Sequence, residues 1–311
     1  MIGEAAHKSE LAARESVTVV IVSDYEAAEQ KSWVNERAVL HALSQQDFPE
    51  PFEVILMENE QFRASIPADL FEGCPDFRME FCGATTSGQL KDEGSRRANG
   101  QLIAILEADC TPAREWLRHM VSALRGRPDC AAVSGKTLYP GRSVFARCRS
   151  LLDRGALDPG GSGPTFGICN NNSIVRRAVL ARYPYPAVSS PFLSAALRWK
   201  AMNQANLRFL FEAGAVVYHA LPGWGFVKEM HCQSGYTLGF QVDGKVPMIL
   251  RGLARHLYYE LRRSWRLRHH YAVASYEVPF AWALAIIAKF YEFKGARSAR
   301  RGGNVPRTSY R

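Results

Sequence analysis

The sequence predicts an α/β fold: a doubly wound, mostly parallel sheet with helices on both faces. Short apolar runs rich in β-branched residues, such as residues 17–22 (VTVVIV), are typical of strands that are covered on both faces. Segments with helical spacing of apolar residues separate these runs, and this alternation is that of an α/β layer structure. We therefore expect one main domain over residues 17–240.

In the first half of the chain, strands and helices are expected to alternate. The predicted strands are 17–22, 52–57, 77–82, 101–106 and 131–134. The predicted helices between them are 30–43, 89–98 and one that begins near Pro112. The last helix would have a proline in its first turn, as helix starts prefer. One of its faces is apolar and consists of Trp116, Leu117, Met120, Val121 and Leu124.

The second half of the domain begins with a segment rich in glycine and proline. Residues 158–164 (DPGGSGP) cannot form a regular helix, and we expect a mobile loop of the kind that often covers ligands. Beyond it, the pattern predicts two helices and two strands, at 178–182, 192–203, 207–211 and 215–219.

The C-terminal part is expected to be a helical extension over residues 241–294 that associates with a membrane surface. Residues 247–270 mix leucine and isoleucine with six arginines and predict a basic amphipathic helix. Residues 278–291 are apolar but include Lys289, and they are too short to cross a bilayer of about 30 Å. Such segments bind anionic lipid by charge and apolar area together. The tail 295–311 is basic and expected to be disordered, and residues 1–16 form a polar N-terminal segment.

The composition limits the compartment and the partners. The formal charge of +9 comes mainly from residues after about position 250 and favours an anionic partner. Seven cysteines without a CxxC pair indicate a reducing compartment. Because the first residues lack the apolar core of a signal peptide, we expect a cytoplasmic protein, peripheral at the inner face of the cell membrane. No aromatic and basic motif of a nucleic-acid-binding module is present, so nucleic acid is not an expected partner.

Two nucleotide-binding motifs are excluded. Residues 134–137 (SGKT) look like the end of a P-loop, but that motif needs glycine five positions before Gly135, where this chain has Cys130. The glycine-rich Rossmann fingerprint is absent after the first strand, where residues 23–26 read SDYE. A P-loop nucleotidase and a nicotinamide enzyme are therefore not expected.

Acidic residues follow three of the predicted strands. Asp24 follows the first strand, Glu58 the second, and the turn with Glu107 and Asp109 follows the strand at 101–106. The carboxyl ends of parallel strands meet at one crevice, so these carboxylates should converge there. Their mutual repulsion favours a bound divalent cation, and hard oxygen ligands suit Mg²⁺ or Mn²⁺. One alternative remains open, in which Asp109 or Thr111 only caps the helix expected at Pro112 and no metal is bound.

An ordered set of segments resembles the family 2 glycosyltransferases with the GT-A fold over about residues 17–239. The opening strand, residues 45–49 (QQDFP) and residues 91–100 (KDEGSRRANG) resemble the family's nucleotide-binding half. Residues 106–112 (LEADCTP) resemble its acidic metal motif, and residues 170–177 (NNNSIVRR) its acceptor-side segment. Residues 211–219 (FEAGAVVYH) resemble the strand that closes the site.

The resemblance implies roles for individual residues. The donor-binding residues would be Asp24, Glu58, Lys91, Glu107 and Asp109. The metal ligands would be Glu107, Asp109 and His219, although a histidine at a strand end is also often only hydrogen-bonded. Asn171 and Asn172 would lie on the acceptor side, where they could instead satisfy loop backbone groups.

The sequence departs from the family pattern at the general base. The family has an acidic pair at the start of the helix predicted at 192–203, and here Leu193 and Ser194 stand in its place. A serine hydroxyl is no general base at neutral pH, and loss of a positioned base costs about 10²–10⁴-fold in rate. His231 or Glu229 could supply the base instead.

Two functions follow from the resemblance. The first is a metal-assisted, inverting transferase that moves a sugar from a nucleotide-sugar donor to a glycan or lipid-linked acceptor, with an anionic membrane surface bound through residues 247–294. The second is a catalytically impaired scaffold in a glycan assembly complex, for which Leu193 and Ser194 are the reason.

Overall fold

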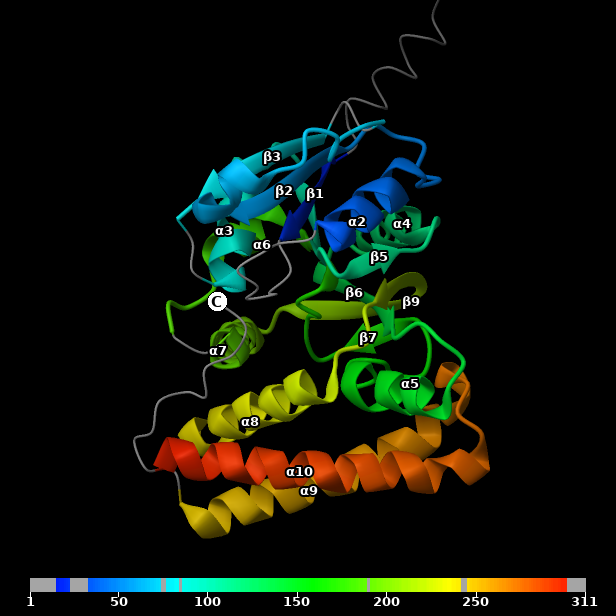
Figure 1. Ribbon diagram of the computed structural model, residues 1–311, viewed down its shortest axis with the longest axis vertical. Helices are drawn as coiled ribbons and strands as arrows, with labels where there is room; N and C mark the ends of the chain where they lie inside the picture. Colours follow the sequence, from blue (N-terminus) through cyan, green and yellow to red (C-terminus); the bar gives the residue numbers. More distant parts are fainter. Residues whose placement is uncertain are drawn as a thin grey trace, which may run out of the picture.

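The computed structural model describes residues 15–22, 33–73, 77–83, 86–188, 191–241 and 245–300, and it confirms the predicted fold class. A nine-stranded sheet runs in the order β3-β2-β1-β4-β8-β6-β9-β5, with β7 paired to β9 (Figure 1). The strands are β1 (Val17–Val22), β2 (Glu53–Asn59), β3 (Phe77–Cys82), β4 (Leu102–Glu107), β5 (Cys110–Pro112), β6 (Cys130–Leu138), β7 (Gly163–Thr165), β8 (Asn172–Arg176) and β9 (Arg208–His219).

The sheet is mixed. Strands β3, β2, β1 and β4 pair in parallel, as predicted for the first half of the chain. Strand β8 lies antiparallel between β4 and β6, and β5 and β7 pair antiparallel with β9. The insertion of β8 places the segment that precedes it, residues 170–171, beside the carboxyl end of β4.

Helices cover both faces because the buried strands are apolar on both sides. Alternate residues of β1 point to opposite faces: Val19 and Ile21 pack with α2 (Val34–Ser44) and α4 (Trp116–Arg125). Val20 and Val22 pack in the second core, with residues of α3 (Ser87–Arg97) and α6 (Arg177–Arg182). The remaining elements of the domain are η1 (Glu60–Ser65), α5 (Val144–Arg149), η2 (Ser150–Arg154) and α7 (Pro191–Gln204).

Several predicted boundaries were wrong. The helix expected from Pro112 begins at Trp116, because Cys110–Pro112 forms β5 and pairs with the end of β9. The two strands expected at 207–211 and 215–219 are one continuous strand, β9. Residues 135–137 lie within β6, which agrees with the exclusion of a P-loop. The end of the expected loop at 158–164 belongs to β7.

A layer of three long helices lies beside the sheet domain (Figure 1). It consists of α8 (Trp224–Gln241), α9 (Val246–Leu267) and α10 (Val278–Arg300), with the short turns η3 (Arg268–Tyr271) and η4 (Ser275–Glu277) between the last two. Helix α10 continues to Arg300, so residues 295–300 of the tail that was expected to be disordered are helical.

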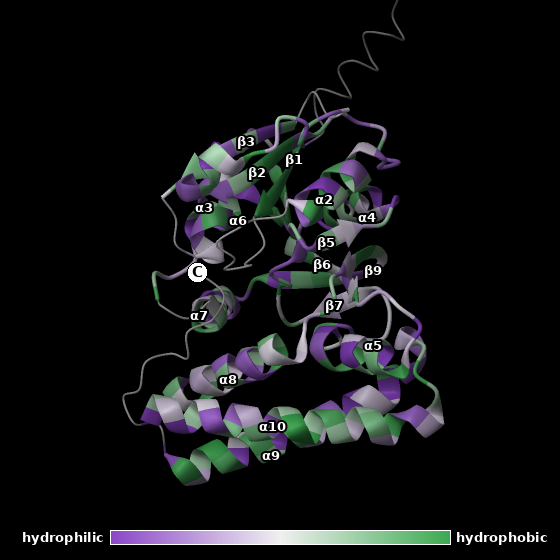
Figure 2. Cartoon of the chain, in the orientation of Figure 1, coloured by the Kyte–Doolittle hydropathy of each residue, from purple (hydrophilic) through white to green (hydrophobic). Residues whose placement is uncertain are grey.

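Glycines set the distance between α8 and α10. A Cβ atom on Gly235 would overlap with the backbone carbonyl of Glu292, and one on Gly295 would overlap with that of Cys232. The two backbones therefore touch without a side chain between them. Figure 2 shows that α9 and α10 mix hydrophobic and hydrophilic residues along their lengths. No helix in the described ranges combines the length and apolarity that a membrane span requires.

Candidate functional site

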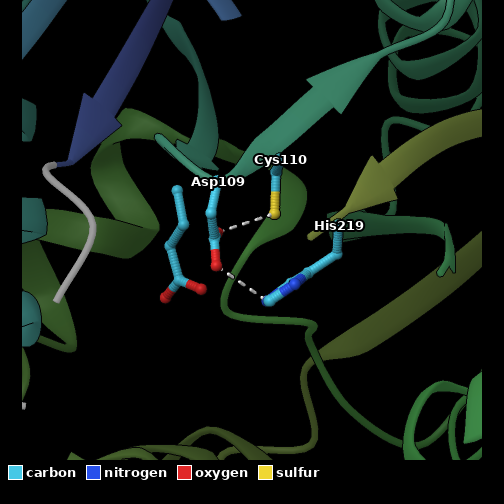
Figure 3. A group of neighbouring side chains, drawn as sticks. Asp109, Cys110 and His219 are labelled. Atoms are coloured by element: carbon cyan, nitrogen blue, oxygen red, sulfur yellow. Dashed lines mark hydrogen bonds and ion pairs between the residues drawn. The ribbon is translucent and has the colours of Figure 1, made fainter. Parts of the chain in front are cut away.

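The acidic turn after β4 faces the last residue of β9. Strand β5 pairs Cys110 with His219, and the Ala220 N–H donates to the Asp109 carbonyl oxygen over 3.0 Å. This pairing brings a carboxylate oxygen of Asp109 to 3.2 Å from Nε2 of His219. Figure 3 shows the two side chains pointing toward each other, with Cys110 beside them. Helix α4 has Glu115 at its N-cap, so neither Asp109 nor Thr111 caps it and that alternative is excluded.

His219 is neutral in this environment. Burial lowers the pKa of His219 to about 3, and the positive charge of Arg154 adds to this effect. Its Nδ1 atom lies 2.7 Å from the carbonyl oxygen of Ala220, which can only accept a hydrogen bond. The ring proton is therefore on Nδ1, and the lone pair of Nε2 faces the Asp109 carboxylate. Two acceptors at this distance repel each other unless a cation lies between them.

Glu107 is held by a buried lysine. Lys91 on α3 is 2% exposed, and its Nζ donates to Glu107 Oε1 over 2.7 Å. Burial alone would lower the pKa of Lys91, but the Glu107 carboxylate outweighs burial and raises it. Conversely, burial would raise the pKa of Glu107, and Lys91 holds it below its usual value. Both groups are therefore charged at neutral pH.

The donor set fits a divalent cation. One ligand atom from each of Glu107, Asp109, Cys110 and His219 lies within 4.8 Å of the others. Burial and then the Asp109 charge raise the pKa of the Cys110 thiol well above its usual value. Sulfur is also a soft ligand that suits Mg²⁺ and Mn²⁺ poorly. Two carboxylates and an imidazole remain, and carboxylates suit Mg²⁺ and Mn²⁺.

A cavity of about 490 Å³ adjoins these residues. Glu107, Lys91, Asn171 and His219 line it on the sheet side, and residues of α7, α8, α9 and α10 complete its walls. Asn171 is held in place because its amide nitrogen lies 3.4 Å from Cys110 Sγ and its oxygen accepts from the Cys169 thiol at 2.8 Å. The volume is in the range of small-molecule binding sites.

The predicted base position contains no carboxylate. Ser194 lines the cavity, but its hydroxyl donates to the Pro186 carbonyl oxygen over 2.7 Å. His231 on α8 also lines the cavity, and its Nδ1 lies 3.4 Å from a carboxylate oxygen of Glu292 on α10. Glu229 is not among the residues that line the cavity.

Four of the predicted site residues in the described ranges are not among those that line the cavity: Glu58, Asp109, Asn172 and Glu229. Asp24 lies outside the described residues. Glu58 is buried at the end of β2, where its carboxylate accepts from the Asn59 N–H over 2.7 Å. Asn172 is fully buried, and its oxygen accepts from Trp116 Nε1 over 2.8 Å. The roles of these residues in binding the donor and the acceptor stay predictions.

Several other residues of the cavity could not be predicted from the sequence. Arg154 comes from η2, and Glu260, Lys289 and Glu292 come from the two C-terminal helices. Lys289 Nζ lies 2.9 Å from Glu260 and 2.8 Å from Glu292, which joins α9 to α10 on the cavity wall. The one feature that could have indicated them is a charged residue within an apolar segment, such as Lys289 in residues 278–291.

Comparison with known proteins gives a family and a fold. Residues 34–183 match the family described as glycosyl transferase family 2. The mannosyltransferase PcManGT from Pyrobaculum calidifontis, solved with GDP-Man and Mn²⁺, superposes with a TM-score of 0.58 at 17% identity, over 96% of this chain and 93% of that one. S. aureus TarS 1-349 superposes with a TM-score of 0.50 at 13% identity, over 92% of this chain and 90% of that one. No curated protein matches by sequence. Residues 34–183 are therefore similar to family 2 glycosyltransferases, and the chain has the GT-A fold of the two superposed structures.

Proposed function

We propose that this protein transfers a sugar from a nucleoside diphosphate donor to a glycan or lipid-linked acceptor, with Mg²⁺ or Mn²⁺ as cofactor. The observation that carries the proposal is the Asp109–His219 pair, two acceptors 3.2 Å apart beside a cavity that can hold a nucleotide sugar. The similar mannosyltransferase was solved with a nucleotide sugar and Mn²⁺, which supports the same pairing of ligand and metal here.

The residues on the two sides of the cavity would have different roles in the proposed reaction. The metal, held by Asp109, His219 and the free oxygen of Glu107, would stabilise negative charge on the leaving diphosphate. Lys91 fixes Glu107 and prevents the carboxylate from turning away. On the opposite side, His231 would accept the proton of the acceptor hydroxyl, with Glu292 orienting its ring. Attack from the side opposite the leaving group would invert the anomeric centre.

A binding screen tests the proposal. Calorimetry with uridine and guanosine diphosphates and their sugars, each with Mn²⁺, should give binding to the wild type and none to Asp109→Ala. A transfer assay with the donor that binds then identifies the product. The proposal is overturned when no uridine or guanosine diphosphate donor binds to the folded wild-type protein.

A catalytically impaired scaffold is the second candidate. It is favoured by Ser194, whose hydroxyl is already used by the Pro186 carbonyl oxygen. Under this alternative, Asp109→Ala leaves the cellular function intact, whereas a transferase loses its function. A null phenotype from Asp109→Ala in a strain with normal protein levels decides for the transferase.

We also propose that residues 241–294 hold the protein at the cytoplasmic face of an anionic membrane. The exposed surface of α9 alternates arginines with large apolar residues, among them Arg251, Arg255, Tyr258, Arg262 and Trp265. Helix α10 adds exposed apolar residues, Phe280, Ile286, Ile287 and Phe290. Such a surface binds lipid through charge and apolar area together.

Point variants test the membrane proposal better than a deletion, because α9 and α10 also form the cavity. Arg251→Glu, Arg255→Glu and Arg262→Glu together should release the protein from vesicles that contain phosphatidylglycerol. Arg114→Glu, Arg118→Glu and Arg127→Glu together, at exposed positions of the sheet domain, are the matched control. Sedimentation with the vesicles that stays unchanged in the α9 variant refutes the proposal.

A further inference from the structure

Arg154 is a half-buried cation that forms no salt bridge with any of the described residues. It is the last residue of η2, and it lines the cavity near Glu107 and His219. Within the described part of the chain, no hydrogen bond or ion pair is recorded for its guanidinium, and its Nε atom is buried without a partner. Its Cζ atom lies 5.4 Å from the centroid of the Tyr139 ring.

The nearby carboxylates are already used. Asp153 accepts from the hydroxyl of Tyr139 over 3.0 Å and from Nε of Arg149 over 2.9 Å. Glu107 accepts from Lys91. Within the described residues Arg154 forms no salt bridge, and a charged group whose Nε atom is buried without a hydrogen-bond partner costs free energy in the folded protein. Such a cost is common at sites that bind a ligand of opposite charge.

The charge balance of the cavity indicates what that ligand is. Lys91, Arg154, Arg263 and Lys289 carry four positive charges on the cavity lining, and Glu107, Asp153, Glu260 and Glu292 carry four negative charges, so the lining is neutral in total. A divalent cation would add two positive charges, and Asp109 beside the lining offsets only one of them. A phosphoryl ligand compensates this excess, and the planar guanidinium can bind two of its oxygens at once.

We propose that Arg154 binds a phosphoryl group in this cavity, on the side of the Asp109–His219 pair. The inference rests on the proposed function and adds to it a residue that holds a phosphate. The group is either the diphosphate of the donor or the phosphate of a lipid-linked acceptor, since both present the same oxygens to an arginine.

The turn that carries Arg154 fits this role. Residues Ser150–Arg154 form a π-helical turn that continues α5, and such turns are frequent at functional sites. The turn is fixed by the Ser150 hydroxyl, which accepts from the Tyr139 N–H over 2.8 Å, and by Arg149, which binds Asp153. Arg154 thus projects from a rigid support, as a preorganised binding residue requires.

Arg154→Met, with Arg149→Met as the matched control, tests the proposal. Calorimetry would measure the binding of a nucleoside diphosphate with Mn²⁺, of inorganic diphosphate without metal, and of a short alkyl phosphate. We expect Arg154→Met to weaken phosphate binding about 10- to 100-fold, which is the loss of one charge-assisted pair. The melting temperature should stay constant or rise, because a charge without a salt bridge to the described residues is removed. Arg149→Met should lower the melting temperature, because it leaves Asp153 without its cationic partner.

The arms of the experiment distinguish the two sources. Weaker binding of the nucleoside diphosphate assigns Arg154 to the donor, and weaker binding of the alkyl phosphate alone assigns it to the acceptor. The inference is overturned when Arg154→Met binds all three phosphates as the wild type does, or when it only lowers the melting temperature. Inorganic diphosphate contains no nucleoside or sugar, so a loss of its binding supports Arg154 even if no nucleotide-sugar donor binds.

Discussion

A carboxylate oxygen of Asp109 lies 3.2 Å from Nε2 of His219, and each of these two atoms directs a lone pair toward the other. The Ala220 carbonyl oxygen keeps the ring proton on the far nitrogen, and burial keeps the ring neutral. The protein therefore holds two acceptors together at a free-energy cost that a shared cation would remove. The pairing of β5 with β9 sets this geometry, since it joins the acidic turn to the end of a distant strand.

Metal affinity should depend on this pair and not on the neighbouring thiol. Asp109→Ala and His219→Ala should each weaken Mn²⁺ binding by more than about 10-fold, the loss expected when even an outer-shell partner of a metal site is removed. Cys110→Ala should bind Mn²⁺ as the wild type does, because sulfur is a soft ligand that suits Mn²⁺ poorly. Titration of Mn²⁺ followed by electron paramagnetic resonance measures all three affinities. Equal loss in the cysteine variant would contradict the assigned ligand set.

The strands in the first half of the fold could be predicted because each can be recognised from its own residues. The run at Val17–Val22 is apolar on both sides, and the structure buries it on both sides. Strand β5 could not be predicted, because three residues that include a proline have no strand pattern of their own. It exists because the end of β9 pairs with it. The helix signal at Pro112 was therefore misread by one turn.

The candidate site was only partly predictable for a similar reason. The acidic turn and His219 could be proposed from a family resemblance, and the structure brings them together. The contact between His231 and Glu292 depends on the packing of α8 against α10, and a single sequence does not specify which helices touch. No sequence pattern marks Arg154, because its proposed role depends on its position at the cavity and on the lack of a salt bridge to it within the described ranges.

Proton transfer should depend on His231 and not on Ser194. His231→Gln should lower kcat about 10²–10⁴-fold and leave the affinity for the donor unchanged, because the proton acceptor is lost while the metal side stays intact. Ser194→Ala should change kcat little, since its hydroxyl serves the Pro186 carbonyl oxygen. Steady-state kinetics with calorimetry of the donor separates the two effects. A normal kcat in His231→Gln would assign the base elsewhere.

A single methyl group added at Gly235 should weaken the packing of α8 against α10. Gly235→Ala places a Cβ atom against the backbone of Glu292, and we expect a loss of about 1–3 kcal/mol in unfolding free energy, as for other overpacked contacts. Gly225→Ala is the matched control, since it lies on the same helix with nothing near its Cβ position. There the higher helix propensity of alanine should add up to about 1 kcal/mol. Urea denaturation measures both, and equal stability of the two variants would disprove the close contact.

Stability should fall as the pH rises toward neutrality because of Asp92. Burial raises the pKa of Asp92 to about 6, although the Tyr185 N–H donates to its carboxylate over 2.8 Å. A carboxyl whose pKa is higher in the folded state stabilises the protein fully below its unfolded pKa near 3.8, and this contribution is lost as the pH rises through about 6. Asp92→Asn keeps an acceptor for the Tyr185 N–H and removes the titration. Its melting temperature should therefore exceed that of the wild type at pH values well above 6, with a smaller difference at lower pH. A difference that is constant across this range would show that Asp92 is already ionised in the folded protein.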